Sequence, residues 1–334
     1  MKSLLLPPLS ALYGAVTRSR LSLYQRGTFH TTKLDRPVIS VGNMTAGGTG
    51  KTPLVEWISK TIAAEGKKVC ILTRGYGREN PQRQVVVSDG HTILAPPAEA
   101  GDEPYLLATK LLGSAAVISN IDRISAGRYA IENLGADCFV LDDGFQHLRL
   151  ARDLNIVTID ASDPWGDPWD NGKLLPYGRL REPLSGLSRA DCVVLTRCDQ
   201  ATYIASLRGH LPDLIHGRPV FLSTMQPVKN LLPTGPVAAF CAIGNPQSFF
   251  SKLHTSGYEV VLEKTFADHH SYTQRDVDRL LNEATHAGAA NLITTAKDAV
   301  KLRSLSLTLP WHVFEIEIAI QNEAEFRQLI ISVL

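Results

Sequence analysis

A glycine-rich segment at residues 42–52, Gly-Asn-Met-Thr-Ala-Gly-Gly-Thr-Gly-Lys-Thr, restricts the fold of this chain more than any other feature. It follows a short apolar run at 37–41, typical of a buried strand, and leads into 52–65, where apolar residues recur at helical spacing. A glycine-rich loop between a strand and a helix is the setting of a phosphate-binding loop, or P-loop, because backbone N–H groups and the helix N-terminus converge on phosphate oxygens. The segment therefore predicts a nucleoside-triphosphate site.

Two side chains of this P-loop have a predicted chemical role. We expect Lys51 to neutralise the β- and γ-phosphates of ATP, and the Thr52 hydroxyl to reach Mg²⁺. Thr45 stands where the usual pattern has glycine, and a coincidental turn is the alternative interpretation. The residues expected to bind the nucleotide are Thr45, Ala46, Gly47, Gly48, Thr49, Gly50, Lys51 and Thr52.

Strand-like and helix-like patterns alternate along the rest of the chain. This alternation predicts an α/β fold, a P-loop NTPase-like and mainly parallel sheet with helices on both faces. The strand-like runs lie at 69–72, 85–87, 116–118, 138–141, 156–159 and 192–195, and the helical patterns at 104–112 and 123–134.

The chain of 334 residues is long enough for two domains. Pro233, Gly235 and Pro236 mark a linker between them. We therefore expect a P-loop domain over 1–234 and a smaller α/β domain over 235–334. In the smaller domain, strand-like runs lie at 237–242, 260–261, 292–294 and 313–318, and helical patterns at 247–255 and 273–287.

Charge and cysteine content exclude some classes of protein. With 34 Lys and Arg against 33 Asp and Glu, the formal net charge is +1, so nucleic-acid binding is disfavoured. The five cysteines are an odd number and contain no Cys-x-x-Cys pair. We therefore expect buried thiols in a reducing compartment rather than a disulfide framework or a zinc site.

The N-terminal segment predicts an amphipathic helix. It is too short and too interrupted by prolines to span a bilayer, and a cleaved signal peptide is disfavoured. Such a helix either lies in a membrane interface or packs on its own domain, and the pattern alone leaves both possibilities open. The apolar residues at helical spacing are Leu9, Leu12, Tyr13, Val16 and Leu23, with Arg18, Arg20 and Arg26 near the other side.

Polar clusters follow several of the predicted strands, and in an open α/β sheet these strand ends meet in one crevice. Asp142 and Asp143 end an apolar strand, as expected of carboxylates that hold Mg²⁺. Asp102 fits a helix cap as well as a catalytic role. The segment 268–270, Asp-His-His, is open to catalysis, metal binding or a surface loop. Arginines in glycine-rich settings suit an anionic or sugar ligand; they are Arg74, Arg78, Arg179 and Arg181.

Together these motifs resemble the tetraacyldisaccharide 4'-kinase family, the lipid A 4'-kinases of Gram-negative bacteria. Two residues depart from the family pattern, Tyr177 and Ala296, and they affect only the expected local packing or peripheral contacts. The resemblance runs from the N-terminal helix to about Lys301. The motifs that carry it, in chain order, are GNMTAGGTGKTP at 42–53, RGYGR at 74–78, GDEP at 101–104, DDGFQH at 142–147, LLPYGRLREP at 174–183, DHH at 268–270 and TTAKD at 294–298.

The resemblance implies ATP- and Mg²⁺-dependent phosphorylation of the 4'-hydroxyl of a tetraacyldisaccharide 1-phosphate, which forms lipid IVA. It implies a peripheral protein at the cytoplasmic face of the inner membrane, with the N-terminal helix at the membrane and the smaller domain closing over the active site. Asp102, assisted by His269, would be the base. Metal contacts are expected from Thr52, Asp142, Asp143 and Glu182, and substrate contacts from Arg74, Tyr76, Arg78, Gln146, His147, Arg179 and Arg181.

Two other classes of function remain as alternatives. The segment 196–199, Thr-Arg-Cys-Asp, is weakly similar to the guanine-reading element of GTPases. A nucleotide-gated membrane adaptor would use the P-loop as a switch and the N-terminal helix as an anchor. No protein partner is expected.

Overall fold

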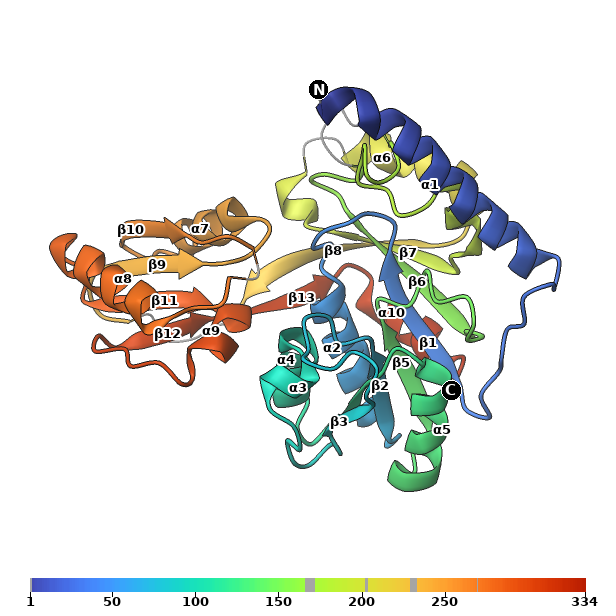
Figure 1. Cartoon of the computed structure of the whole chain (residues 1–334), viewed down its shortest axis with the longest axis horizontal. Coiled ribbons are helices and arrows are strands. Elements are labelled where there is room, and N and C mark those ends of the chain that lie inside the picture. The colour runs from blue at the N-terminus through green and yellow to red at the C-terminus, as the bar shows by residue number, and fades with distance from the viewer. Residues whose placement is uncertain (1, 166–171, 202–203, 229–232, 269) are drawn as a thin grey trace.

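The computed structural model describes residues 2–165, 172–201, 204–228, 233–268 and 270–334, and these residues contain a large and a small sheet (Figure 1). The strand order of the large sheet is β13-β8-β7-β6-β1-β5-β2-β4-β3. Its strands are β1 (Val38–Asn43), β2 (Val69–Thr73), β3 (Val85–Ser88), β4 (Ala115–Ser119), β5 (Cys138–Asp142), β6 (Leu154–Asp160), β7 (Cys192–Thr196), β8 (Val220–Pro227) and β13 (Ile316–Ile320).

The large sheet is parallel except at its two edges. β1 lies between β5 and β6 and is parallel to both, whereas β3 is antiparallel to β4 and β13 is antiparallel to β8. The inner strands β1, β2 and β4 to β7 are buried along their whole length, as expected of strands covered by helices on both faces. The predicted α/β fold is therefore confirmed.

Helices cover both faces of this sheet. On one face lie α2 (Lys51–Ala64), α4 (Asp102–Lys110) and α10 (Glu323–Ile331), preceded by the short α3 (Pro97–Ala100). The other face carries α5 (Arg123–Leu134), α6 (Ile204–Ile215) and the 3₁₀ turn η1 (Leu184–Arg189). A second 3₁₀ turn, η2 (Cys198–Gln200), follows β7.

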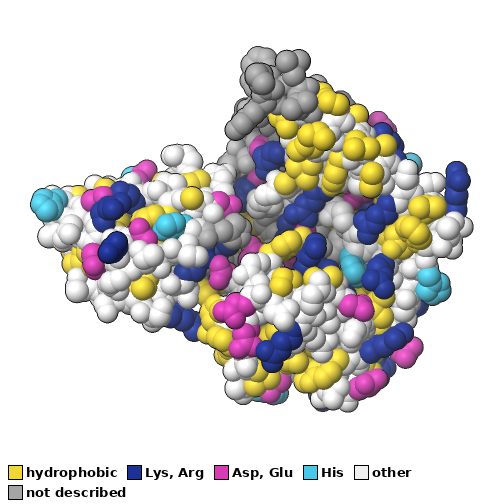
Figure 2. Space-filling model, viewed as in Figure 1, with side chains coloured by type: hydrophobic (Ala, Val, Ile, Leu, Met, Phe, Trp, Pro, Cys, Tyr) yellow, Lys and Arg dark blue, Asp and Glu magenta, His cyan; other side chains and the backbone are white. Residues whose placement is uncertain are grey.

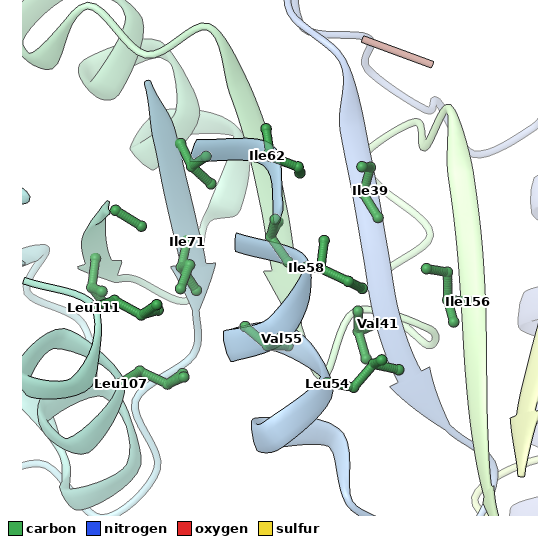
Figure 3. Close-up of a cluster of buried hydrophobic side chains, with 14 of the residues drawn as sticks. Ile39, Val41, Leu54, Val55, Ile58, Ile62, Ile71, Leu107, Leu111 and Ile156 are labelled. Atoms are coloured by element: carbon green, nitrogen blue, oxygen red, sulfur yellow. The ribbon is translucent and has the colours of Figure 1, made fainter. Parts of the chain in front are cut away.

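The core beneath α2 places the P-loop at the carboxyl edge of the sheet. Leu54, Ile58 and Ile62 recur at four-residue spacing and are fully buried against Ile39 and Val41 of β1 (Figure 3). Burying an aliphatic side chain of this size contributes about 1.5–3 kcal/mol, so this stripe fixes the helix on the sheet. The N-terminus of α2 is thereby held where β1 ends.

The small sheet is parallel, with the strand order β10-β9-β11-β12. Its two faces carry separate hydrophobic clusters, so it has a core of its own. Its elements are β9 (Val237–Cys241), α7 (Pro246–Thr255), β10 (Val260–Thr265), α8 (Gln274–His286), β11 (Asn291–Thr295), α9 (Ala296–Leu302) and β12 (Trp311–Phe314).

The expected C-terminal boundary of the small domain is wrong. The predicted strand at 313–318 is two strands that belong to different sheets, β12 in the small sheet and β13 in the large one. After β13 the chain forms α10, whose buried Phe326 packs against Trp57 of α2 and Phe221 of β8. The segment from Ile316 onward therefore completes the P-loop domain. β8, which has an alternating burial pattern, was also not predicted.

The N-terminal helix α1 (Lys2–Gln25) lies along the large domain with one face turned inward (Figure 1). Ser10 donates a hydrogen bond to the Leu174 carbonyl at 2.7 Å, and the Tyr13 hydroxyl donates to the Arg181 carbonyl at 2.8 Å. Tyr13 therefore lies on the inner face of α1. The sequence pattern had grouped it with Leu9, Leu12 and Val16, which lie on the exposed face. No helix in the described residues is long and apolar enough to cross a bilayer.

Candidate active site

The P-loop connects β1 to α2 with a backbone conformation that needs glycine. Gly47 and Gly50 have φ of 114° and 74°, in the region that glycine alone adopts freely. A Cβ on Gly50 would lie 2.7 Å from Cε of Met225, so close packing also excludes a side chain there. The chain therefore reaches the N-terminus of α2 in a tight curl, which leaves backbone N–H groups for an anion.

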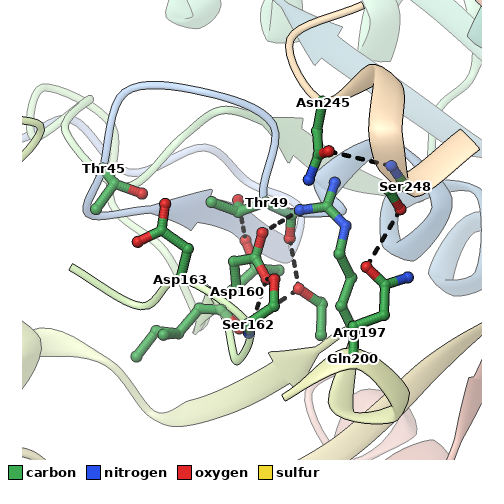
Figure 4. A network of polar contacts seen from close by, with 12 residues as sticks. Thr45, Thr49, Asp160, Ser162, Asp163, Arg197, Gln200, Asn245 and Ser248 are labelled. Atoms are coloured by element: carbon green, nitrogen blue, oxygen red, sulfur yellow. Dashed lines mark hydrogen bonds and ion pairs between the residues drawn. The ribbon is translucent and has the colours of Figure 1, made fainter. Parts of the chain in front are cut away.

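Neighbouring segments hold the loop in this shape. The Ala46 N–H donates to the Arg179 carbonyl at 2.7 Å, and the Thr196 hydroxyl donates to the Thr49 carbonyl at 3.0 Å (Figure 4). The Thr49 hydroxyl lies 2.8 Å from that of Thr158. Thr45 and Thr49 are buried, so these two residues would meet a nucleotide through their backbone.

Two cations converge on one carboxylate beside the loop. Lys51 Nζ lies 3.5 Å from Oδ1 of Asp143, and the Arg181 guanidinium donates to both oxygens of Asp143 at 2.8 Å. Burial would raise the pKa of Asp143, but Lys51 and Arg181 outweigh it and hold that pKa below its usual value. Two positive charges against the one negative charge of Asp143 make the mouth of the P-loop electropositive, which suits phosphate groups.

Asp142, the last residue of β5, has a pKa shifted in the opposite direction from that of Asp143. Its side chain is buried and accepts a hydrogen bond of 3.3 Å from the Thr73 hydroxyl. Burial, followed by the nearby Glu103 and Asp143, raises the pKa of Asp142 to about 7. A divalent cation would relieve this unfavourable charge, and Mg²⁺ binds one or two protein carboxylates together with phosphates and water. Among the described residues, no three His, Cys, Asp or Glu side chains are grouped so that they could hold a metal ion.

Asp102 opens α4 and faces the small domain. Its Oδ2 lies 3.7 Å from Nζ of Lys301 in α9, and the same Nζ donates to the His270 carbonyl at 3.1 Å. The ring of His270 itself lies within 3.2 Å of Asp276 at the start of α8. His269 lies outside the described residues, so its predicted role stays a prediction. Asp102 and the His270 carbonyl both contact the ammonium of Lys301.

Among the predicted substrate residues, Arg74 and Tyr76 lie at the surface. The Arg74 guanidinium donates to the Tyr76 hydroxyl at 3.1 Å and lies 5.0 Å from the ring centroid. Arg78 from the same loop is buried and donates to the carbonyls of Ser119 and Pro81. The expectation that Arg78 binds substrate is therefore corrected, because its guanidinium is used to hold the loop.

Glu182 is buried beside the P-loop. It is 1% exposed, with Oε1 accepting from Gln146 at 2.8 Å and Oε2 from Arg189 at 2.7 Å. Gln146 donates as well to the Asn43 carbonyl at 2.9 Å. Both residues therefore support the base of the P-loop, and the expected metal contact of Glu182 and substrate contact of Gln146 stay predictions.

Arg179 and Arg181 lie against the P-loop rather than apart from it. Arg179 donates to the Ala46 carbonyl at 3.1–3.2 Å and pairs with Asp163. A Cβ on Gly47 would lie 2.9 Å from its guanidinium. Because Arg181 is bound to Asp143 beside Lys51, both arginines lie at the P-loop, and their expected contacts with the substrate stay predictions.

His147 lies among arginines with its Nε2 buried and unpartnered. Burial, with Arg123, Arg152 and Arg149, lowers the pKa of His147 to about 3. Although Nε2 is enclosed, the residue as a whole is half-buried. The expected contact of His147 with the substrate stays a prediction.

The pKa of His147 makes the stability of the protein depend on pH. Below pH 6.5 the unfolded chain binds a proton at His147 that the folded chain does not, so the free energy of unfolding falls by up to about 1.4 kcal/mol per pH unit. His147→Gln should reduce the stability lost between pH 7 and pH 5, measured by urea denaturation. The exposed His91, replaced by Gln, is the control and should leave the slope unchanged. Equal slopes for wild type and His147→Gln would contradict the prediction.

One residue near the carboxylates was missed by the sequence analysis. Arg123, at the start of α5, is 6% exposed. Burial lowers the pKa of Arg123, whereas Asp142 and Asp143 oppose this shift, and so its charge acts on the carboxylate pair. The available signal was an arginine at the first position of a helix that begins four residues after the end of β4.

A P-loop on a parallel sheet, cations at its mouth and a carboxylate pair at the end of the neighbouring strand define the class of P-loop phosphotransferases. Comparison with known proteins narrows this class. A family model described as Tetraacyldisaccharide-1-P 4'-kinase matches residues 2–334. The chain belongs to this family, which confirms the resemblance seen in its motifs, and it is thereby an ATP-dependent kinase that acts on the 4'-hydroxyl of the lipid A precursor.

Individual relatives support this membership. The tetraacyldisaccharide 4'-kinase of Geobacter sulfurreducens is 44% identical over 314 residues, covering 92% of this chain and 87% of that protein. The one from Geobacter metallireducens is 45% identical over 303 residues, covering 89% and 88%. A crystal structure of the Aquifex aeolicus family member in complex with ATP is similar with a TM-score of 0.77 and 31% identity, over 98% of this chain and 97% of that one.

Proposed function

We propose that the 4'-kinase reaction of this chain takes place between the P-loop and Asp102, with Mg²⁺ as cofactor and Asp102 as base. The observation that carries the proposal is the packing around Asp142 at the end of β5. β5 pairs with β1, which leads into the P-loop, and with β2, whose Thr73 donates to Asp142. The loop after β2 packs against Gly101, where a Cβ would lie 2.9 Å from the Tyr76 carbonyl oxygen, and Gly101 directly precedes Asp102. These contacts support a phosphate site and a base at one edge of the sheet. A hydroxyl held beside Asp102 has access to the γ-phosphate.

In this reaction the 4'-oxygen of the sugar forms a bond to the γ-phosphorus, and the bond from that phosphorus to the bridging oxygen breaks, releasing ADP. The hydroxyl proton passes to Asp102, assisted by His269. Lys51 and Arg181 offset the negative charge on the transferring group. Thr52 with Asp142 or Asp143 would hold Mg²⁺, which would supply further neutralisation of the phosphate charge.

The other functions considered have less support. A guanine-reading role requires a free Asp199, but its carboxylate pairs with Lys252 of α7 at 2.8 Å. Gln200 beside it accepts a hydrogen bond from Ser248 at 3.2 Å (Figure 4). This segment thus joins the two domains. The adaptor function leaves Asp102 without a role.

The test is transfer of labelled γ-phosphate from ATP to purified tetraacyldisaccharide 1-phosphate in mixed micelles. We expect transfer with Mg²⁺, loss of transfer when EDTA removes it, and weak transfer from GTP. A folded protein that binds ATP but phosphorylates no lipid would overturn the proposal and favour the adaptor. Equal activity with and without EDTA would contradict the part of the proposal that assigns Mg²⁺ as cofactor.

We further propose that α1 holds the enzyme at the cytoplasmic face of the inner membrane. Leu9, Leu12 and Val16 are 50%, 62% and 60% exposed on the outer face of α1, and Figure 2 shows hydrophobic side chains gathered over this helix. Arg18 is exposed on the same helix and is available to anionic headgroups. A lipid with four acyl chains leaves the bilayer only at a high cost, so the enzyme has to work at the surface.

Charge on the outer face of α1 should release the protein from membranes. Leu12→Glu removes an apolar group worth about 2 kcal/mol and adds a charge that anionic lipid repels, so vesicle binding should weaken about tenfold or more. The measurement is co-sedimentation with vesicles containing phosphatidylglycerol. Gln25→Glu, at an exposed position at the end of the same helix, adds a charge outside the patch and should bind nearly as wild type. Unchanged binding of Leu12→Glu would argue against this surface.

A further inference from the structure

Lys301 of α9 joins the proposed base to the small domain. Its side chain is 8% exposed, and its ammonium lies 3.7 Å from Oδ2 of Asp102 and 3.1 Å from the His270 carbonyl oxygen. Asp102 comes from α4 of the P-loop domain, whereas Lys301 and His270 come from the small domain. One nearly buried cation therefore bridges the carboxylate and the loop that contains His269.

Two flanking contacts dock the same helices. Lys297 Nζ lies 3.1 Å from Oε1 of Glu103, and Arg303 donates to the Tyr105 hydroxyl at 2.5 Å with its guanidinium 5.0 Å from the ring centroid. The Lys297–Glu103 pair is more exposed than the Lys301 ammonium, with side-chain exposures of 21% and 42%. An exposed pair of this kind contributes about 0–1 kcal/mol to docking. Neither flanking contact involves Asp102 or His270.

The small domain presents Lys301 on a fixed platform. Asp298, one turn earlier in α9, is fully buried, and its Oδ2 accepts hydrogen bonds from the Ala242 N–H at 3.1 Å and the Thr295 hydroxyl at 2.7 Å. These bonds tie the start of α9 to the end of β9. Since α9 cannot shift on its sheet without breaking them, the position of Lys301 follows the position of the whole small domain.

We propose that Lys301 is a positioning residue for phosphoryl transfer, which fixes the Asp102 carboxylate and the His270 backbone in the geometry that proton removal needs. The inference rests on the proposed role of Asp102 as base. Burying an ammonium is costly unless its partners repay the cost, and here the partners are the two groups that the reaction has to align. The active arrangement is then complete only while the small domain is docked on α4.

The test compares steady-state kinetics of four variants with those of wild type and of Asp102→Asn. Lys301→Met keeps the aliphatic stem and removes the charge, and we expect kcat to fall about 10-fold to 100-fold because small misplacements of reacting groups have effects of this size. The KM for ATP should change little, and Lys301→Arg should recover part of the lost kcat. Lys297→Met, on the same helix, should lose less than about threefold.

The fourth variant combines Lys301→Met with Asp102→Asn. If Lys301 acts through Asp102, the double variant should be no slower than Asp102→Asn alone, because no carboxylate base remains for Lys301 to position. Multiplying losses, or equal losses in Lys301→Met and Lys297→Met, would overturn the inference while leaving Asp102 as base. Full activity of Asp102→Asn would instead overturn the proposed base, and the inference with it. Thermal unfolding of each variant identifies losses caused by misfolding.

Discussion

Lys51→Ala is expected to lower kcat by about 10³-fold, because the transferring phosphate loses a positive charge. Lys51 opens α2 with its side chain only 14% exposed, and its charge faces Asp143 at the mouth of the P-loop. Removing it leaves the developing charge on the γ-phosphate without its nearest cation. Arg181 remains bound to Asp143 and does not replace an ammonium at the helix N-terminus.

The matched control lies on the same helix. Lys60 of α2 is 51% exposed and pairs with Glu56 at 2.7 Å, so Lys60→Ala removes an equal charge from the outer surface and should keep nearly full kcat. The measurement is the initial rate of labelled phosphate transfer at saturating ATP, with circular dichroism to show that both variants fold. A Lys51→Ala enzyme that works within tenfold of wild type would exclude this lysine from the transferring group.

Asp102→Asn is expected to lower kcat by about 10²-fold to 10⁴-fold, the range for loss of a general base. The amide keeps the size of the side chain and the start of α4 but cannot take the hydroxyl proton. ATP binding should change by no more than a few fold, since the P-loop contacts are untouched. Isothermal titration with ATP, alongside the transfer assay, separates these two quantities.

Its control is Glu99→Gln in α3, three residues earlier in the chain. Glu99 pairs with Arg83 at 3.3 Å on the surface, and its neutralisation should leave kcat close to wild type. Wild-type turnover by Asp102→Asn would show that another group accepts the proton. Loss of ATP affinity together with turnover would show instead that Asp102 supports the nucleotide site.

The P-loop and the α/β fold could be predicted from the sequence because both depend on local patterns. The local features are the glycines at 47 and 50, a lysine at the helix start and an apolar stripe on α2. They indicate a phosphate-binding loop and a packed helix in any chain, since backbone conformation and helical periodicity depend on only a few residues. The carboxylate pair at 142–143 was predictable for the same reason, as it directly follows a buried strand.

The sequence did not reveal which charged residues are buried and paired. Arg78 and Glu182 stand in motifs beside residues of the site, yet one holds carbonyl groups and the other a glutamine and an arginine. Their partners are distant in the chain, so no local pattern distinguishes them from Arg74 or Asp143. The unequal pKa values of Asp142 and Asp143 likewise arise from long-range neighbours.

By itself, then, the sequence determined the family, the phosphate-binding loop and the alternation of strands and helices in the first domain, all of which depend on contiguous residues. Only the tertiary structure decided that the chain returns at Ile316 to complete the first sheet, and that Lys301 lies against Asp102. The physical reason is that strand pairing and buried charge pairs join residues far apart in the chain, and their energies depend on how the whole molecule excludes water.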